Sequence, residues 1–273
     1  MKKSIFICYL LASSVFALTL FAQEEYFADK SKISLKTTDA LEIGVQSYWY
    51  EYEEKVNGAF FMSNKGSKYG ASLTGTKSLG SDYFIIGDVR YATGNVEYKS
   101  ASGTGDVSDN MYEVRLAAGK EVVVDGYLLS TFAGLGYRRL DNDLRDLGSG
   151  GYRRTSQYLY LPIGVTHRFM IDNSSRISTT IEYDYLLKAE QKSYLSDISP
   201  ADAALFGDPV NKQKSGYGIR ASTAYEEKYW SAGLFFNYWK IDDSEINYYG
   251  VWSVMEPRNE TKEIGVQLKY RFN

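Results

Sequence analysis

The segment Lys262–Asn273 reads KEIGVQLKYRFN. Apolar residues occupy every second position from Ile264 to Phe272, and polar residues or glycine lie between them. In a β-strand successive side chains point to opposite faces, so a two-residue period predicts a strand with one apolar and one polar face. The segment therefore predicts a strand that separates two environments of different polarity.

The first residues are typical of a secretory signal peptide. Two lysines precede an apolar run from Ile5 to Ala22, which is the usual order of a charged region and a hydrophobic region. We expect residues 1–22 to be removed and residues 23–40 to form a polar tail. Cys8 is the chain's only cysteine, so the mature chain would contain neither disulfide nor thiol nucleophile.

The composition narrows the class further. The formal net charge is -3, which argues against nucleic acid as a partner. Tyrosine (25) and glycine (24) are abundant, whereas proline (4) is rare, and the mean hydropathy of -0.34 leaves no membrane helix beyond the predicted signal. An exported chain of this kind would cross a membrane with strands, and residues 41–273 are expected to form one barrel.

Ten segments with a two-residue period follow the predicted tail. Each is long enough for a tilted strand to cross a bilayer, which needs about 9–11 residues. They are Leu41–Tyr52, Gly66–Leu79, Asp82–Tyr98, Met111–Val123, Tyr127–Arg139, Ser156–Phe169, Arg176–Lys188, Ser215–Glu226, Tyr229–Ile241 and Lys262–Phe272.

The connections between these segments alternate in length. The short ones are Gly80–Ser81, Val124–Gly126, Met170–Ser175 and Glu227–Lys228, and the long ones are Glu53–Lys65, Lys99–Asn110, Leu140–Thr155, Ala189–Lys214 and Asp242–Thr261. A soluble β-sandwich also has many strands, but nothing requires its loops to alternate. This alternation of short and long connections predicts an all-β fold: a closed antiparallel transmembrane barrel of about ten strands, with short periplasmic turns and long extracellular loops.

Charges of both signs fall on the inward face of the predicted strands. In one interpretation they line a selective channel; in the other they pair across a narrow lumen and fill it, because an unpaired buried charge is costly. We expect a largely filled lumen, with a narrow porin-like channel for small solutes as the alternative. The predicted lumen charges are Asp88, Arg90, Glu113, Arg115, Glu182, Asp184, Arg220 and Lys269.

The last strand resembles the C-terminal assembly signal of Gram-negative outer-membrane barrels. The residues that carry this resemblance are Glu263, Gly265, Leu268, Tyr270 and Phe272, although Asn273 follows the closing aromatic here. Segments SYWYEYEE (47–54), SKYGASLTG (67–75) and MEPRNETKEIGV (255–266) are similar to small, porin-like outer-membrane barrels. The resemblance implies an outer-membrane location, contact with lipid and lipopolysaccharide, and handling by periplasmic chaperones and the outer-membrane assembly machinery.

Catalysis is not expected. Ten-stranded barrels include the omptin proteases, which need an Asp–His and an Asp–Asp pair at the outer rim. The sole histidine, His167, falls near the periplasmic end of its strand, points toward lipid and has no neighbouring carboxylate or nucleophile. We predict a monomeric, non-enzymatic barrel without cofactor or metal that acts as a structural or surface-binding module.

Two long connections carry the remaining signals. Ser199 before Pro200, with Gly207 after the apolar residues, predicts a short helix over 199–206. The last connection contains Tyr248, Tyr249, Trp252 and Met255, which form a binding patch, cover the barrel mouth or enter the outer leaflet. The two connections are also candidates to pack on each other as a lid.

Overall fold

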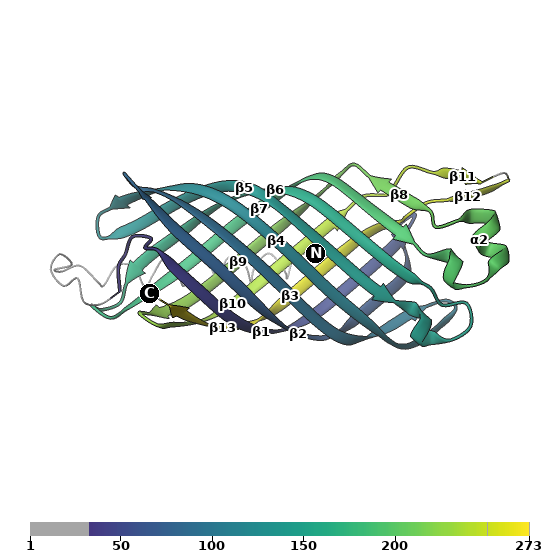
Figure 1. Ribbon diagram of the computed structural model, residues 1–273, viewed down its shortest axis with the longest axis horizontal. Helices are drawn as coiled ribbons and strands as arrows, with labels where there is room; N and C mark the ends of the chain where they lie inside the picture. Colours follow the sequence, from purple (N-terminus) through teal and green to yellow (C-terminus); the bar gives the residue numbers. More distant parts are fainter. Residues whose placement is uncertain (1–32, 250, 273) are drawn as a thin grey trace.

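The computed structural model describes residues 33–249 and 251–272, so the predicted signal peptide and most of the predicted tail lie outside it. Ten antiparallel strands close into a single barrel (Figure 1). They are β1 (Ala40–Val56), β2 (Ala59–Gly80), β3 (Tyr83–Ser100), β4 (Gly103–Val124), β5 (Tyr127–Asp143), β6 (Arg153–Met170), β7 (Ser175–Ser193), β9 (Gly216–Glu227), β10 (Trp230–Ile241) and β13 (Arg258–Phe272). The closed ten-stranded antiparallel barrel predicted from the sequence is confirmed.

The barrel closes where β13 pairs with β1. The register runs from Leu41 opposite Phe272 to Lys55 opposite Arg258, without interruption. The segment that alternates most clearly in the sequence is therefore a closing strand, with β10 on its other side. Closure leaves the sheet without a free edge, which is required of a sheet in hydrocarbon.

Two of the five predicted long loops are wrong. Strands β1 and β2 continue to a hairpin at Asn57 and Gly58, whose φ angles of 52° and 82° fit a type I′ turn. Strands β3 and β4 likewise continue to a two-residue turn at 101–102. The strand period persists through both segments, but most of their outward residues are charged or polar, so the sequence predicted loops.

The other three long connections gather at the same end of the barrel as those hairpins, on the right of Figure 1. They contain η1 (Leu144–Leu147), η2 (Leu195–Asp197), α2 (Pro200–Phe206), β8 (Val210–Gln213), β11 (Asn247–Tyr249) and β12 (Trp252–Val254). The predicted short helix is confirmed as α2, which Ser199 caps by accepting a hydrogen bond from the Asp202 amide. In the described part of the chain, no helix has the length and apolarity to traverse a membrane.

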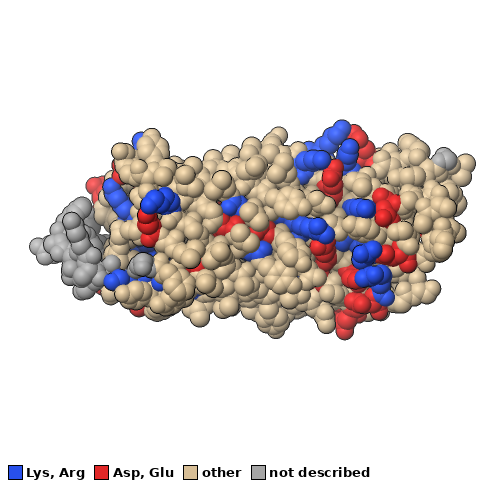
Figure 2. All heavy atoms as spheres, in the orientation of Figure 1, with Lys and Arg blue, Asp and Glu red and all other residues tan. Residues whose placement is uncertain are grey.

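The outer surface has two zones, and a row of outward tyrosines separates them. We call the row, which contains Tyr69, Tyr91, Tyr112, Tyr137, Tyr183, Tyr217 and Tyr238, the tyrosine row. Between it and the tight turns at 81–82, 125–126, 171–174 and 228–229 lies the turn half, whose outward side chains are mostly apolar. Beyond the row lies the loop half, whose outward side chains are mostly charged; Figure 2 shows these charges clustered toward the loop end.

The interior has the opposite arrangement. Inward side chains of the turn half are mostly polar or charged, with a few aromatics among them, whereas those of the loop half form most of the main apolar cluster of the described residues. That cluster includes Tyr48, Tyr50, Tyr52, Met62, Val96, Val107, Met111, Leu140, Tyr158 and Trp239. The loop half is thus built like a soluble β-protein, and only the turn half has the lipid-facing surface of a membrane barrel.

Candidate functional site

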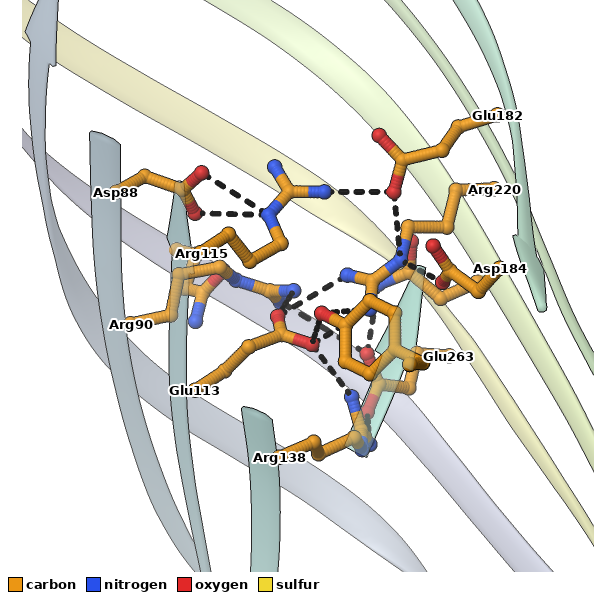
Figure 3. A network of polar contacts seen from close by, with 12 residues as sticks. Asp88, Arg90, Glu113, Arg115, Arg138, Glu182, Asp184, Arg220 and Glu263 are labelled. Atoms are coloured by element: carbon orange, nitrogen blue, oxygen red, sulfur yellow. Dashed lines mark hydrogen bonds and ion pairs between the residues drawn. The ribbon is translucent and has the colours of Figure 1, made fainter. Parts of the chain in front are cut away.

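Inward charges from six strands meet across the lumen at the level of the tyrosine row (Figure 3). We call this group the charge network. Its members are Asp88 and Arg90 on β3, Glu113 and Arg115 on β4, Arg138 on β5, Glu182 and Asp184 on β7, Arg220 on β9 and Glu263 on β13. Several of them are direct cross-strand partners, such as Arg90 with Glu113 and Glu182 with Arg220. The sheet register therefore sets opposite charges side by side before any side chain reaches across the lumen.

Glu113 lies at the centre of the network and its side chain is fully buried. Both of its carboxylate oxygens accept from Arg220, at 2.5 and 3.0 Å, and Arg90 donates to Oε2 at 2.8 Å. The Tyr160 hydroxyl donates to Oε1 at 2.8 Å. Such a fork geometry is the strongest form of carboxylate–guanidinium pairing.

A second group of contacts ties β7 to the network. Arg115 donates from Nε to Asp88 at 2.9 and 3.1 Å and from a terminal nitrogen to Glu182 at 2.7 Å. Arg220 donates from Nε to Asp184 at 2.6 Å and lies 3.3 Å from Glu182. Since β4 and β7 are not sheet neighbours, the Arg115–Glu182 pair crosses the lumen.

The third group joins β5 to β13. Arg138, whose side chain is fully buried, donates to Glu263, and Asn237 donates to the other Glu263 oxygen at 2.7 Å. Arg138 also lies 3.9 Å from Glu113, which links this pair to the centre. These side chains bridge nearly opposite walls of the barrel.

The charges almost balance. Five carboxylates meet four guanidiniums, and every one of the nine groups has an oppositely charged atom within 4.0 Å. Removing one partner from such a buried group leaves an uncompensated charge, which typically costs about 3–5 kcal/mol. The network therefore braces opposite walls of the barrel with paired charges at this level of the lumen.

The sequence placed most of these residues on the inward face. Seven of the eight predicted lumen charges lie in the network, whereas Lys269 lies nearer the turns and donates to Thr74 at 3.3 Å. Arg138 and Tyr160 were not predicted to face inward. For Arg138 the reason is that a second arginine, Arg139, follows it directly; for Tyr160 it is that aromatic side chains were expected on the lipid face. The alternation of faces along the strand could have identified Arg138, because it is an even number of positions from the inward Phe132.

No protein-family model and no curated protein sequence matches this chain. Solved structures do match. The outer membrane protease OmpT from Escherichia coli has a TM-score of 0.52 at 13% identity, with 89% of this chain and 100% of OmpT covered. The outer membrane protein OprG from Pseudomonas aeruginosa has a TM-score of 0.40 at 10% identity, with 87% and 97% covered. Ail, the attachment invasion locus protein of Yersinia pestis, has a TM-score of 0.35 at 11% identity, with 86% and 100% covered.

This chain has the outer-membrane β-barrel fold. In barrels of this fold the short turns face the periplasm and the other end faces the outside, so the turn half spans the membrane and the loop half projects from it. The matched structures include a protease, so the fold by itself assigns no activity to the chain.

The residues of the predicted assembly signal also make contacts or face lipid in the folded barrel. Glu263 belongs to the charge network, while Leu268, Tyr270 and Phe272 are exposed on the lipid face. A Cβ on Gly265 would lie 2.3 Å from that of Tyr48, so glycine is needed there for Tyr48 to cross β13. Recognition of these residues by the assembly machinery stays a prediction.

His167 lies on β6 close to the turn end. Its ring packs against Tyr127 and Phe169, with centroids 5.2 and 5.7 Å away. It is the chain's only histidine, so the end of the barrel that carries the loops has none. Within residues 33–249 and 251–272, no group of three or more His, Cys, Asp or Glu side chains is arranged to hold a metal ion.

The connection between β10 and β13 is held against the extracellular mouth of the barrel by buried ion pairs. Arg154 on β6 donates to Glu54 on β1 at 2.5 Å and to Glu256, between β12 and β13, at 2.7 Å. Burial raises the pKa of Glu256 well above its ordinary value; Arg154 opposes this shift and the Glu54 carboxylate adds to it. Two buried carboxylates thus share one guanidinium, and the docked loop favours a proton on Glu256.

The connection from β7 to β9 is tied down independently. The Arg153 guanidinium donates to both oxygens of Asp197, at 2.9 Å each, and holds the pKa of that carboxyl at about 2. Phe206 of α2 contacts Tyr249 and Trp252 of the β11–β12 hairpin, with ring centroids 6.1 and 6.4 Å apart. The two extracellular connections therefore pack on each other.

Proposed function

We propose that this protein is an integral outer-membrane barrel without catalytic activity, whose filled lumen supports an extracellular binding platform. The observation that carries the proposal is the interior of the loop half, where Tyr50, Met111, Tyr158 and Trp239 are at most 1% exposed. A core of this density above a charge network leaves no continuous path for a solute. The loop half then acts as a stalk that holds the connections away from the membrane.

The absence of catalysis is inferred from the chemistry at the outer rim. The sole histidine is at the other end of the barrel, and the buried carboxylates Glu54 and Glu256 are engaged by Arg154. The network carboxylates are paired with guanidiniums in the same way. A paired carboxylate with no nucleophile beside it has no route to general-base chemistry.

The platform consists of α2 and the β11–β12 hairpin. Its tip exposes large apolar side chains: Leu205 at 48%, Tyr248 at 75%, Val251 at 95% and Trp252 at 56%. Connections 194–215 and 242–257 contain seven acidic residues and two lysines. An aromatic surface with an acidic surround favours a partner that is cationic and partly apolar.

The remaining partners follow from the surface of the turn half. Outer-membrane lipid would contact its apolar side chains, and lipopolysaccharide would contact the tyrosine row and the charges just above it. Chaperones and the assembly machinery would handle the chain on its way to the membrane. The closed barrel needs no second copy to complete its sheet, so we propose a monomer.

Conductance across a planar lipid bilayer tests the filled lumen. The parent protein should insert and stay electrically silent. Steady openings in the parent, altered by Glu113→Gln, would overturn this proposal in favour of a narrow channel. Binding of an amphipathic lysine–leucine peptide to protein in nanodiscs tests the platform: it should weaken about tenfold in Trp252→Ser, whereas a glutamate–leucine peptide should not bind. Equal binding of both peptides would contradict the platform.

A further inference from the structure

A cavity of about 210 Å³ lies in the turn half, between the charge network and the periplasmic end of the barrel. Arg115, Glu182 and Arg220 of the charge network line the end of the cavity nearer the loops. The apolar core of the loop half lies beyond them. A ligand would therefore enter from the periplasmic side, past residues 34–37, which hydrogen-bond to inward side chains at that end. For scale, an apolar cavity of about 150 Å³ in another protein binds benzene.

One cation on the cavity wall differs from all the others. The lining guanidiniums of Arg90, Arg115, Arg168 and Arg220 each have a carboxylate oxygen within 3 Å. Lys269 has none within 4.0 Å among the described residues, and its single hydrogen bond goes to the Thr74 hydroxyl at 3.3 Å. The ammonium is thus the one lining charge in the described chain that is free to receive an anion.

The wall opposite Lys269 is aromatic. Phe132 lies on β5, five strands from β13 in either direction around the closed ring, and Phe84 lies on the intervening β3. Lys269 and the Phe132 ring therefore lie on opposite walls of the cavity. That pairing suits a molecule with an anionic group at one end and a flat apolar group at the other.

Three glycines keep this space open. An added Cβ would lie 2.4 Å from the Phe132 ring at Gly164, 2.4 Å from the Phe84 ring at Gly119, and 2.8 Å from the Lys269 stem at Gly44. Each side chain therefore lies flat along the wall over a glycine of the next strand instead of projecting into the lumen. The sequence places a glycine beside each side chain that defines the cavity.

We propose that this cavity binds small aromatic or short-chain carboxylates from the periplasm, with Lys269 holding the carboxylate and Phe132 and Phe84 contacting the apolar group. The proposal does not depend on the extracellular platform. It is compatible with a silent lumen, because the ligand enters and leaves by the same end.

Methyl NMR on Ile86, which lines the cavity, tests the proposal in lipid nanodiscs. The probes are benzoate and its neutral analogue benzyl alcohol, titrated to about 10 mM. Benzoate should shift the Ile86 methyl signal, and Lys269→Met should weaken its binding about ten- to a hundredfold while leaving benzyl alcohol nearly unchanged. Lys262→Met, which removes an outward lysine from the same strand, is the matched control and should change neither.

Gly164→Ala is the second variant. Its methyl group would push the Phe132 ring into the cavity, so binding of both probes should weaken at least tenfold. An unshifted Ile86 signal in the parent would overturn the proposal, as would benzoate binding that is unchanged in both Lys269→Met and Gly164→Ala.

Discussion

The turn half and the loop half of this barrel use the same strands with opposite faces. In the turn half the outside is mostly apolar and the lumen mostly polar or charged. In the loop half the lumen holds the main apolar cluster, with a few buried ion pairs, and the outside is mostly charged. Backbone hydrogen bonding is continuous through both, so it does not set the difference. What changes is the medium outside the sheet, lipid for one half and water for the other.

Strand β1 carries this inversion within a single segment. Its outward side chains are Leu41, Ile43, Val45 and Trp49 up to the tyrosine row, and Glu51 and Glu53 beyond it. Its inward side chains change from Glu42 and Gln46 to Tyr48, Tyr50 and Tyr52 over the same stretch. Residues 40–49 alone are as many as a bilayer-crossing strand requires, so the rest of the strand is free to project.

The largest effect should come from the charge network. Glu113→Ala removes the partner of Arg90 and Arg220 from a fully buried site, so the free energy of unfolding should fall by about 3–5 kcal/mol. Denaturant unfolding in lipid vesicles measures it. Glu51→Ala, which removes a partly exposed partner of Lys65, is the control and should cost about 0–1 kcal/mol. Equal effects would mean that the network is solvated.

A core substitution in the loop half should come next. Met111 on β4 is fully buried in the apolar cluster, so Met111→Ala should lower the free energy of unfolding by about 2–5 kcal/mol through the cavity it leaves. The same unfolding experiment applies. Glu97→Ala, at an exposed position on β3, should change stability by less than about 0.5 kcal/mol. A small effect at Met111 would contradict a packed interior.

A charge on the outer surface distinguishes the halves directly. Leu234 and Lys240 both face outward on β10, but Leu234 lies in the turn half. Leu234→Arg should destabilise the inserted barrel by about 2–4 kcal/mol, as expected near the bilayer midplane. Lys240→Leu, in the water-exposed half, should have little effect. If Leu234→Arg were neutral, that position would not face lipid.

The contacts of Arg154 with Glu54 and Glu256, which hold the connection between β10 and β13 on the barrel mouth, should respond to pH. Since the pKa of Glu256 is raised when the loop is docked, docking is strongest at low pH and weakens as the pH rises through that raised value. Fluorine NMR of fluorotryptophan-labelled protein should show the Trp252 signal changing as the pH is raised through that value. Glu256→Gln should abolish this change, and an unchanged pH profile in that variant would exclude Glu256 as the cause.

Much of the fold was predictable because the strand period survives in both halves. The lumen charges were also predictable, since Asp88, Glu113 and Glu182 alternate with apolar neighbours. The hairpins at Asn57 and at 101–102 were not, because a segment with water outside and an apolar core inside has polar side chains where a membrane strand has apolar ones. The inward aromatics Tyr160 and Trp239 were not predictable for the same reason, because water replaces lipid outside the loop half and aromatics can then face inward.

Depth measurements along β1 test the central claim most directly. The chain's only cysteine is Cys8, in the predicted signal, so single cysteines at outward positions of β1 can be spin-labelled without interference. Labels at Ile43 and Val45 should collide with oxygen dissolved in lipid, and labels at Glu51 and Glu53 with a water-soluble nickel complex. Lipid-type accessibility that continues through Glu53 would contradict the account, as would water-type accessibility at Val45.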